Sequence, residues 1–392
     1  MTDFSERIKY LADRYYPVGQ HARHSLHAYP ETAFEEVRTS KLISDILSEY
    51  GIEHKLIAKT GVVGLIKGEK PGKTVLLRAD MDALELEEAP SALLRSERAG
   101  YMHACGHDGH VAGLIMAALI LSDLKSELPG NVKLMFQPAE ESVGGAKPMI
   151  DEGLLENPPV DAAFAVHLWG EAEFGEVWIK NGAVMAAPDE FRLRIIGKGG
   201  HAAHPQFTAD PIVMSANIIN LFQQIISRRR DPVSPAVITV GSIHAGEVHN
   251  IIPSHADLVG TIRTFDREVR KLIISEMEKA VSAVTNAWGG SYEFKVLERY
   301  PAVLNNPDMA DIARIAAAKI VGADKIKEPS VPNMGGEDFA FVANAVPAAY
   351  LFVGIKKGEM ILHHNPNFSF DTEIIKVSSA VISQTALDFL SK

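Results

Sequence analysis

The sequence predicts an α/β fold in which a smaller α+β domain is inserted into a larger catalytic domain. Short apolar runs recur along much of the chain with helical stretches between them, which is typical of a sheet buried on both faces. From about residue 187 to about residue 298, the pattern changes to strands that alternate between apolar and polar residues. A chain of 392 residues is also too long for one ordinary core, so two domains are expected.

The apolar pattern places the elements of the larger domain. Residues 4–26 and 37–50 have the spacing of helices, and the apolar run at residues 111–121 is expected to be a buried helix. Strands are expected at residues 62–66, 74–79, 132–136, 162–166 and 348–353. Helices between several of these strands favour a largely parallel sheet.

The inserted domain is expected to have the order β-α-β-β-α-β, which is that of a ferredoxin-like unit. Its strands are expected at residues 191–195, 236–240, 256–264 and 291–296, and its helices at residues 209–227 and 267–287. The predicted domain limits are residues 1–186 for the first part of the catalytic domain, 187–298 for the inserted domain and 299–392 for the second part.

Composition excludes several classes of partner. A net charge of −11 argues against nucleic acid, because phosphate binding needs a basic face. No apolar run approaches the ~18–20 residues that span a bilayer, so no membrane partner is expected. The first residues lack the pattern of a secretory signal, and one cysteine rules out an internal disulfide framework. The expected location is the cytoplasm.

Acidic and imidazole side chains follow the predicted strands. Asp80 and Asp82 come directly after residues 74–79, and the pair Glu140-Glu141 follows residues 132–136. His167 follows the next strand, and the pair His363-His364 follows the last one. Since ligands bind beyond the carboxyl ends of strands in open α/β sheets, these side chains are expected to gather at one edge. Cations or hydrogen bonds must offset so much buried charge.

A Cys-x-His pair precedes the apolar helix. Cys105 and His107 are a compact pair of ligands for a first-row metal, and Asp108 is expected to be the N-cap of that helix. The helix N-terminus would favour a thiolate at Cys105. Taken singly, a lone cysteine or histidine is more often structural, and Glu140-Glu141 could be a solvated helix start. Their joint occurrence at strand ends favours a metal site.

Eight motifs are spread over nearly the whole chain. They are Leu-His-Ala-Tyr-Pro-Glu (26–31), Arg-Ala-Asp-Met-Asp-Ala-Leu (78–84), His-Ala-Cys-Gly-His-Asp (103–108), Phe-Gln-Pro-Ala-Glu-Glu (136–141), Gly-Gly-His-Ala-Ala (199–203), Asn-Ile-Ile-Pro (250–253), Gly-Thr-Ile-Arg-Thr (260–264) and Met-Gly-Gly-Glu-Asp-Phe (334–339). Together they resemble the M20 metallopeptidases. Within that family they resemble the amidohydrolase branch of hippurate hydrolases, IAA-amino acid hydrolases and N-acetyldiaminopimelate deacetylases.

The resemblance implies a di-metal exopeptidase-like catalytic domain with a ferredoxin-like satellite domain that serves as a lid or in dimerisation. It implies two divalent ions (Mn, Zn, Co or Ni) and assigns Glu140 as general base. The implied metal ligands are Cys105, His107, Glu141, His167 and His364. His364 is preferred to His363 because the family's ligand lies two positions before a proline.

Further residues take their implied roles from the same resemblance. Asp82 is expected in the active site, although Asp80 could play that part instead or the carboxylate could only cap a turn. His201 would support the developing oxyanion across a dimer or on domain closure. Asn250 and Arg263 match positions near the substrate carboxylate, and Arg263 could instead form a structural ion pair. Glu85 departs from the family, which usually has proline there.

The expected activity is hydrolysis of an N-acyl amino acid to a carboxylic acid and an amino acid. The alternatives are a dipeptidase or carbamoyl-amide hydrolase on the same scaffold, and a non-catalytic protein that binds acylated amino acids. Both glutamates of the Glu140-Glu141 pair are present, which argues against the binder, since a binder has no use for a general base. A homodimer or homotetramer is expected, with an edge strand of the inserted domain pairing with its copy.

Overall fold

The computed structural model describes residues 4–90 and 94–392, and the chain forms two compact units. The first unit comprises Met1–Val184, Leu304–Pro332 and Asp338–Lys392. The second comprises Met185–Val303 and Asn333–Glu337. Each has a hydrophobic core of its own.

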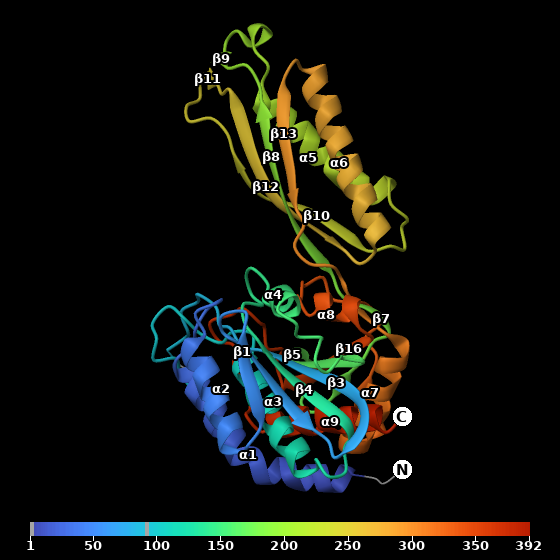
Figure 1. Ribbon diagram of the computed structural model, residues 1–392. Coiled ribbons are helices and arrows are strands. Elements are labelled where there is room, and N and C mark those ends of the chain that lie inside the picture. Colours follow the sequence, from blue (N-terminus) through green and yellow to red (C-terminus); the bar gives the residue numbers. More distant parts are fainter. Residues whose placement is uncertain (1–3, 91–93) are drawn as a thin grey trace. The chain divides into compact units, whose positions relative to one another are not determined.

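The first unit is built on an eight-stranded sheet with the order β1-β2-β4-β3-β5-β16-β6-β15 (Figure 1). Its central strands β4, β3, β5 and β16 are parallel. Their apolar residues are buried on both faces, as expected for such a sheet. The strands are β1 (Glu53–Ile57), β2 (Gly61–Lys67), β3 (Lys70–Asp80), β4 (Pro129–Gln137), β5 (Ala162–Glu173), β6 (Val177–Trp178), β15 (Ile326–Lys327) and β16 (Ala348–Lys356), and β7 (Gly182–Met185) pairs separately with β14 (Val303–Asn305).

Helices cover this sheet, and α1, α3 and α9 pack against one another in the core. The helices are α1 (Ser5–Ala28), α2 (Val37–Glu49), α3 (His107–Asp123), α4 (Ala146–Asp151), α7 (Pro307–Val321), α8 (Ala340–Ala345) and α9 (Ile374–Leu390), with a short 3₁₀ turn, η2, at Ala323–Lys325. Helix α3 is buried from His107 to Leu121, which confirms the buried helix expected there. Within the described ranges, no helix has the length and hydropathy to cross a bilayer.

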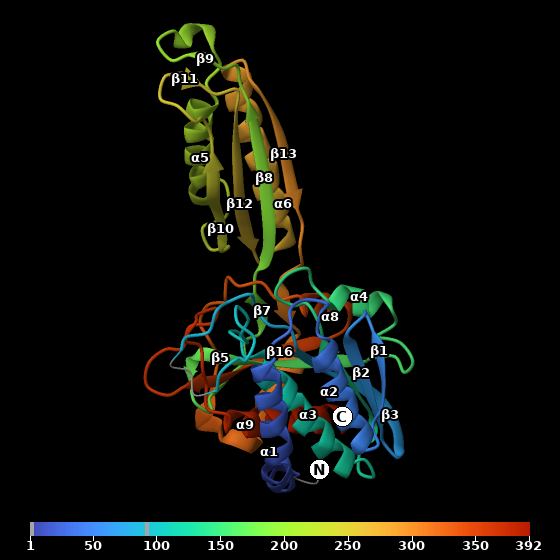
Figure 2. The ribbon, with the colours of Figure 1, turned by 90° about the vertical axis from the view of Figure 1, so that its left-hand side faces the viewer.

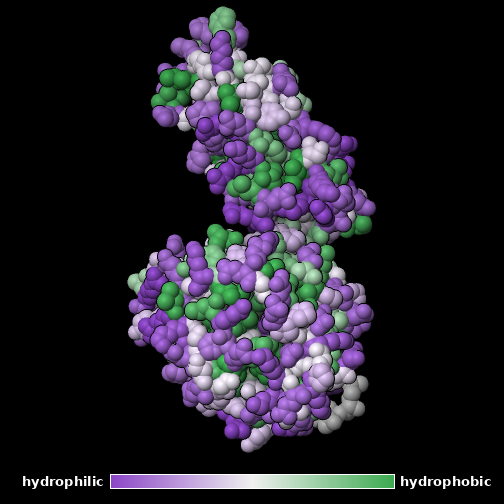
Figure 3. All heavy atoms as spheres, in the orientation of Figure 1, coloured by the Kyte–Doolittle hydropathy of each residue, from purple (hydrophilic) through white to green (hydrophobic). Residues whose placement is uncertain are grey.

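The second unit is ferredoxin-like, as the sequence predicts (Figure 2). Its antiparallel sheet has the order β10-β12-β8-β13, and α5 and α6 pack against it around Phe191 and Phe222. The elements are β8 (Ala187–Ile196), α5 (Pro211–Arg228), β10 (Ala236–His244), β12 (His255–Thr264), α6 (Arg267–Ala287) and β13 (Ser291–Leu297), with a small antiparallel pair of β9 (Gly200–His201) and β11 (Ile251–Ile252) and a 3₁₀ turn, η1, at Pro205–Phe207. The visible face of each unit is mostly hydrophilic, with hydrophobic areas between the hydrophilic residues (Figure 3).

One strand continues further than the sequence suggests. The apolar run at residues 162–166 is only the first part of β5, which extends to Glu173, so His167 lies within the strand. The parallel pairing of β3 with β5 ends at Arg78 opposite Ala165. His167, two residues on, is therefore level with Asp80 at the end of β3.

Candidate metal centre

Three side chains from distant parts of the first unit meet beyond the sheet. Cys105 precedes α3, Glu141 follows β4, and His364 lies in the loop after β16. Their ligand atoms all lie within 4.8 Å of one another, and His364 Nε2 is 3.2 Å from Glu141 Oε1. A thiol, a carboxylate and an imidazole form a donor set that suits a first-row divalent metal.

A second group lies beside the first and shares Glu141 with it. The ligand atoms of His107, Glu140 and Glu141 are also within 4.8 Å of one another. His107 Nε2 is 3.7 Å from Glu141 Oε1. Two adjoining donor groups are what a site for two ions requires.

The two buried histidines are fixed in the tautomer that a metal ligand needs. His107 Nδ1 donates to the backbone carbonyl of Asp82 over 2.9 Å, and His167 Nδ1 donates to the carbonyl of Leu168 over 2.7 Å. Because a carbonyl only accepts, each Nδ1 carries a hydrogen, and the lone pair of each neutral ring is on Nε2, where a metal would displace any further proton. His167 Nε2 is 3.5 Å from Cys105 Sγ, so this fifth side chain also reaches the cluster.

Orphaned buried atoms show that these residues fit a metal. Among the residues that the structure describes, His107 Nε2 and Glu141 Oε1 are buried without a well-aligned hydrogen bond, although His364 Nε2 lies 3.2 Å from the latter. A buried polar atom left unsatisfied costs about 1–3 kcal/mol. Divalent cations would satisfy both atoms.

The local electrostatics indicate the same requirement. Burial lowers the pKa of His107, but Asp80, Asp82 and Glu141 outweigh it and raise this pKa to about 10. Burial raises the pKa of the Cys105 thiol well above its usual range, and the carboxylates of Glu141 and Glu140 raise it further. The start of α3 therefore does not by itself produce a thiolate at Cys105. A cation would offset the surplus negative charge.

Two buried carboxylates hold the turn that carries the glutamate pair. Asp82 Oδ1 accepts the N–H of Glu140 and Asp82 Oδ2 accepts the N–H of Glu141, each at 3.0 Å. Glu36 Oε1 accepts the N–H of Ala139 at 2.9 Å. Ala139 has a φ of 58°, a conformation that costs a non-glycine residue free energy. Three backbone hydrogen bonds thus maintain a strained turn beside the cluster.

The expectation that Asp108 caps α3 is wrong. Gly106 is the N-cap because its φ of 88° lets the helix begin already at His107. Asp108 lies in the first turn instead, and its Oδ2 accepts hydrogen bonds from Arg23 Nε at 3.2 Å and His27 Nδ1 at 2.9 Å. It ties α3 to α1 behind the cluster.

The two neighbouring histidines of the last loop have different surroundings. His364 approaches Glu141, and its own N–H donates to the carbonyl of Ala104 over 2.9 Å. His363 Nε2 instead donates to the carbonyl of Leu168 over 3.0 Å, and its ring packs on Trp169. The geometry therefore places His364, not His363, among the candidate ligand atoms.

Comparison with known proteins decides the family. The model of peptidase family M20/M25/M40 matches residues 76–388. The chain belongs to peptidase family M20. The resemblance indicated by the eight motifs is thereby confirmed, and the M20 chain is a metal-dependent hydrolase by family.

Three similar proteins span most of this M20 chain. Thermostable carboxypeptidase 1 of Saccharolobus solfataricus is 39% identical over 378 residues, which are 94% of this chain and 95% of that protein. The N-acyl-L-amino acid amidohydrolase of Geobacillus stearothermophilus is 41% identical over 302 residues, 76% of this chain and 81% of that one. The crystal structure of the YXEP protein of Bacillus subtilis, described as a dinuclear metal binding peptidase from the M20 family, has 32% identity and a TM-score of 0.85 and covers 97% of this chain and 99% of its own.

The three remaining predicted residues of this M20 chain lie in its second unit. His201 on β9 is paired with Ile251 on β11, and the N–H of Ala202 donates to the carbonyl of Asn250 over 3.1 Å. His201 and Asn250 are thus neighbours, and both are exposed.

Arg263 is far from that pair along the same unit. It lies near the end of β12, eight residues after His255, which at about 3.3 Å per residue is roughly 26 Å along the strand. It is partly buried, and burial lowers the pKa of its guanidinium. Arg263 forms no ion pair with any residue of the described ranges, so the structural ion pair considered for it is not seen.

The sequence alone assigns no firm role to three buried residues around the M20 site, namely Glu36, Asp80 and His110. Glu36 holds the Ala139 turn, as described above, and Asp80 is bonded to His110. Nothing in residues 31–36 indicates the contact between Glu36 and Ala139, because these residues are 103 positions apart. The contact of His110 has a weak signal in the sequence, since His110 lies three residues after His107 and thus one helical turn along the same face.

Proposed function

We propose that the protein hydrolyses the amide bond of N-acyl amino acids with two divalent metal ions. The observation that carries the proposal is the position of Glu140, a buried carboxylate within 4.8 Å of the ligand atoms of both His107 and Glu141. An M20 chain that keeps a potential base beside its metal-ligand cluster is suited to catalysis. The similarity to an N-acyl-L-amino acid amidohydrolase supports this substrate class.

Five side chains would hold the ions, namely Cys105, His107, Glu141, His167 and His364. Their mixture of sulfur, nitrogen and oxygen suits manganese, zinc, cobalt or nickel. When bound, such ions make water more acidic and polarise the carbonyl of the scissile amide.

Glu140 would serve first as base and then as acid. Its carboxylate would take a proton from the attacking water and pass it to the leaving amine, which completes the exchange of water for amine at the acyl carbon. Asp82 would act through the backbone, because its two oxygens hold the N–H groups of Glu140 and Glu141. We therefore assign Asp82 a positioning role.

The second unit would supply substrate contacts. His201 would stabilise the developing oxyanion, and Asn250 and Arg263 would bind the substrate carboxylate. Roughly 26 Å separates Arg263 from the end of β12 near the β9–β11 pair. One small substrate therefore cannot contact Arg263 and the His201–Asn250 pair of the same chain. A homodimer, or a homotetramer built from such dimers, would reconcile these roles by supplying one of them from the partner chain. Light scattering tests this point, and a monomer with full activity would contradict it.

A second candidate is carboxypeptidase activity, which the 39% identity to a thermostable carboxypeptidase favours. At its scissile bond, a peptide is an amino acid whose amine carries an acyl group, so one site can accept both classes. A panel of N-acetyl and N-benzoyl amino acids and of dipeptides and longer peptides, compared by kcat/KM, separates them. We also propose a cytoplasmic location, which the single cysteine supports.

The decisive variant for the proposed function is Glu140→Gln. It should keep its metal and lose at least about a hundredfold in kcat, because general base catalysis contributes 10²–10⁴. A matched control is Glu152→Gln, since Glu152 accepts a backbone N–H from Ala58 outside the cluster. Hydrolysis at the wild-type rate by Glu140→Gln would reject the assigned base.

A further inference from the structure

A series of hydrogen bonds connects Asp80 and His110 to the candidate ligand His167. His110 Nδ1 is 2.5 Å from Asp80 Oδ1, and the N–H of Leu168 donates to His110 Nε2 over 2.9 Å. The carbonyl of the same Leu168 residue accepts from His167 Nδ1 over 2.7 Å. Asp80, His110 and His167 are thus linked through the backbone on either side of Leu168.

The hydrogens of this series of bonds can be assigned without ambiguity. A backbone N–H can only donate, so His110 Nε2 must carry a lone pair. A neutral His110 then carries its hydrogen on Nδ1 and donates it to Asp80. The other oxygen of Asp80 accepts from Arg78 Nη1 at 2.6 Å, and this guanidinium favours the carboxylate form that accepts from His110.

His110 is not itself available as a metal ligand. Both of its ring nitrogens already have partners, and both oxygens of Asp80 are engaged as well, one by His110 and the other by Arg78 Nη1 at 2.6 Å. The ligand atoms of these two residues lie within 4.8 Å of those of His107 and His167, yet only the latter two histidines keep a lone pair directed at the cluster.

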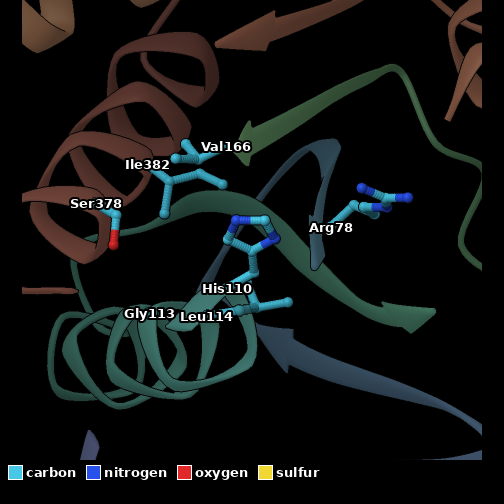
Figure 4. Close-up of a pocket in the computed structure, with 7 residues that line it drawn as sticks. All are labelled: Arg78, His110, Gly113, Leu114, Val166, Ser378 and Ile382. Carbon is cyan, nitrogen blue, oxygen red and sulfur yellow. The ribbon is translucent and has the colours of Figure 1, made fainter. Parts of the chain in front are cut away.

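The surroundings of His110 hold its ring in place. The ring rises from α3 with Val166 and Ile382 on one side and Arg78 on the other (Figure 4). The cavity beside it measures about 10 Å³, which leaves room for at most about one water. The His110 ring also packs edge-on against that of His167, with centroids 4.4 Å apart.

We infer that His110 is a positioning residue for the metal centre, which fixes the Leu168 backbone and through it the place and tautomer of His167. The inference rests on the ligand role proposed for His167. His110 accepts the N–H of Leu168, and the carbonyl of Leu168 accepts from His167 Nδ1. His167 Nε2 therefore faces Cys105. Loss of the His110 acceptor would leave the buried N–H of Leu168 without its partner and loosen one ion.

A pair of variants separates the two hydrogen bonds of His110. In His110→Gln, the side-chain oxygen can take the place of Nε2 and accept from Leu168, while the bond to Asp80 is lost. In His110→Asn, the amide nitrogen can take the place of Nδ1 and donate to Asp80, while the acceptor for Leu168 is lost. His110→Met is of similar size and offers neither bond, which provides a second test should the asparagine variant fold poorly.

The measurement is Co²⁺ binding to metal-free protein, followed by competition with a chelator and by the visible absorption of the bound ion. We expect His110→Asn and His110→Met to weaken one of the Co²⁺ binding events by about 10–100-fold and to change its absorption bands. His110→Gln should stay within about threefold of wild type. Urea unfolding of the metal-free proteins shows that the loss is not one of folding.

Each contrary result has a distinct meaning. Wild-type Co²⁺ affinity in both His110→Asn and His110→Met would overturn the inference alone, and so would a loss in His110→Gln as large as that in His110→Asn. A wild-type chain that binds no Co²⁺ would overturn the proposed function and the inference with it.

Discussion

His107 and His167 reach the cluster from different elements but are oriented by the same device. Each donates Nδ1–H to a backbone carbonyl, and each leaves Nε2 toward the cluster. The carbonyl of Leu168 lies within β5, and that of Asp82 lies in the buried segment that directly follows β3. At the scale of the residue, the site is therefore preorganised by the backbone of β5 and of the segment after β3.

Asp82 gives a prediction at this scale. In Asp82→Asn one oxygen becomes an amide nitrogen, so one of the N–H groups of Glu140 and Glu141 loses its acceptor. An unsatisfied buried donor costs about 1–3 kcal/mol, so kcat should fall by roughly 5–150-fold at saturating metal. The control is Asp161→Asn, because Asp161 also accepts a backbone N–H, from Thr74, at the opposite end of β3. An Asp82→Asn variant with unchanged kcat would rule out the positioning role.

At the scale of the element, the site depends on close approaches between segments distant in sequence. Gly170 on β5 lies against the loop that carries His364. A Cβ atom added at Gly170 would be 1.8 Å from the carbonyl oxygen of Ile361, a contact that only a shift of the backbone could relieve. A glycine is required here for packing, not for its φ.

Gly170→Ala is therefore expected to be destabilising and to disturb the metal centre. Overpacking of this kind costs about 1–3 kcal/mol, and the displaced loop should weaken metal binding through His364. Urea unfolding and metal titration measure the two effects. Gly241→Ala is the matched control, since its Cβ would meet nothing closer than 3.9 Å. If Gly170→Ala behaved like the control, the packing argument would fail.

The tie between α1 and α3 predicts a pH dependence. His27 Nδ1 is 2.9 Å from Asp108 and Nε2 is 2.9 Å from Glu88, so a protonated ring satisfies both carboxylates. Burial lowers the pKa of His27, but these two partners outweigh it and raise this pKa to about 9 from its ordinary value of 6.5. The stabilisation is fully present below pH 6.5 and is lost as the pH rises through 9. Its upper bound is about 3 kcal/mol.

The difference in unfolding free energy between wild type and His27→Gln measures this effect. It should be largest at and below pH 6.5 and should shrink as the pH passes 9. Both proteins are compared metal-free, so that metal binding does not contribute. A difference that stayed constant across this range would contradict the assignment of a protonated His27.

Some elements could be predicted from sequence and others could not, for physical reasons. The strands at residues 74–79, 132–136, 162–166 and 348–353 are confirmed because strands buried on both faces are nearly continuous apolar runs. The two-residue strands β6 and β15 have no such pattern, since a periodicity needs more residues to be visible. The sequence predicts the wrong N-cap for α3, because a glycine at φ 88° can start a helix without a side-chain cap.

The site shows the same division. Ligand types at strand ends predict a cluster, and the structure brings Cys105, His107, Glu141, His167 and His364 together. The residues that support the cluster were not predictable to the same degree. Glu36 and His110 accept backbone N–H groups of Ala139 and Leu168. Since every residue except proline has a backbone N–H, the residue types at positions 139 and 168 do not indicate these contacts.

At the scale of the whole molecule, all candidate metal ligands belong to the first unit, which has a core separate from that of the second. Ligands that bind only the folded state stabilise the unit that holds them. Removal of metal should therefore affect the two units unequally.

Hydrogen exchange with and without a chelator tests this expectation. Chelation should increase exchange at the start of α3, in residues 138–141 and in residues 363–368, while β8, β10 and β12 remain protected. The ferredoxin-like unit is the internal control. Equal deprotection of both units would contradict a metal centre confined to the first.

The central claim is that five side chains scattered along the sequence bind a pair of divalent ions. Anomalous diffraction from crystals soaked with Zn²⁺ or Co²⁺ tests it most directly. The account predicts two anomalous peaks, contacted between them by Cys105, His107, Glu141, His167 and His364. No peak at these side chains after soaking, or ions bound only elsewhere, would contradict it.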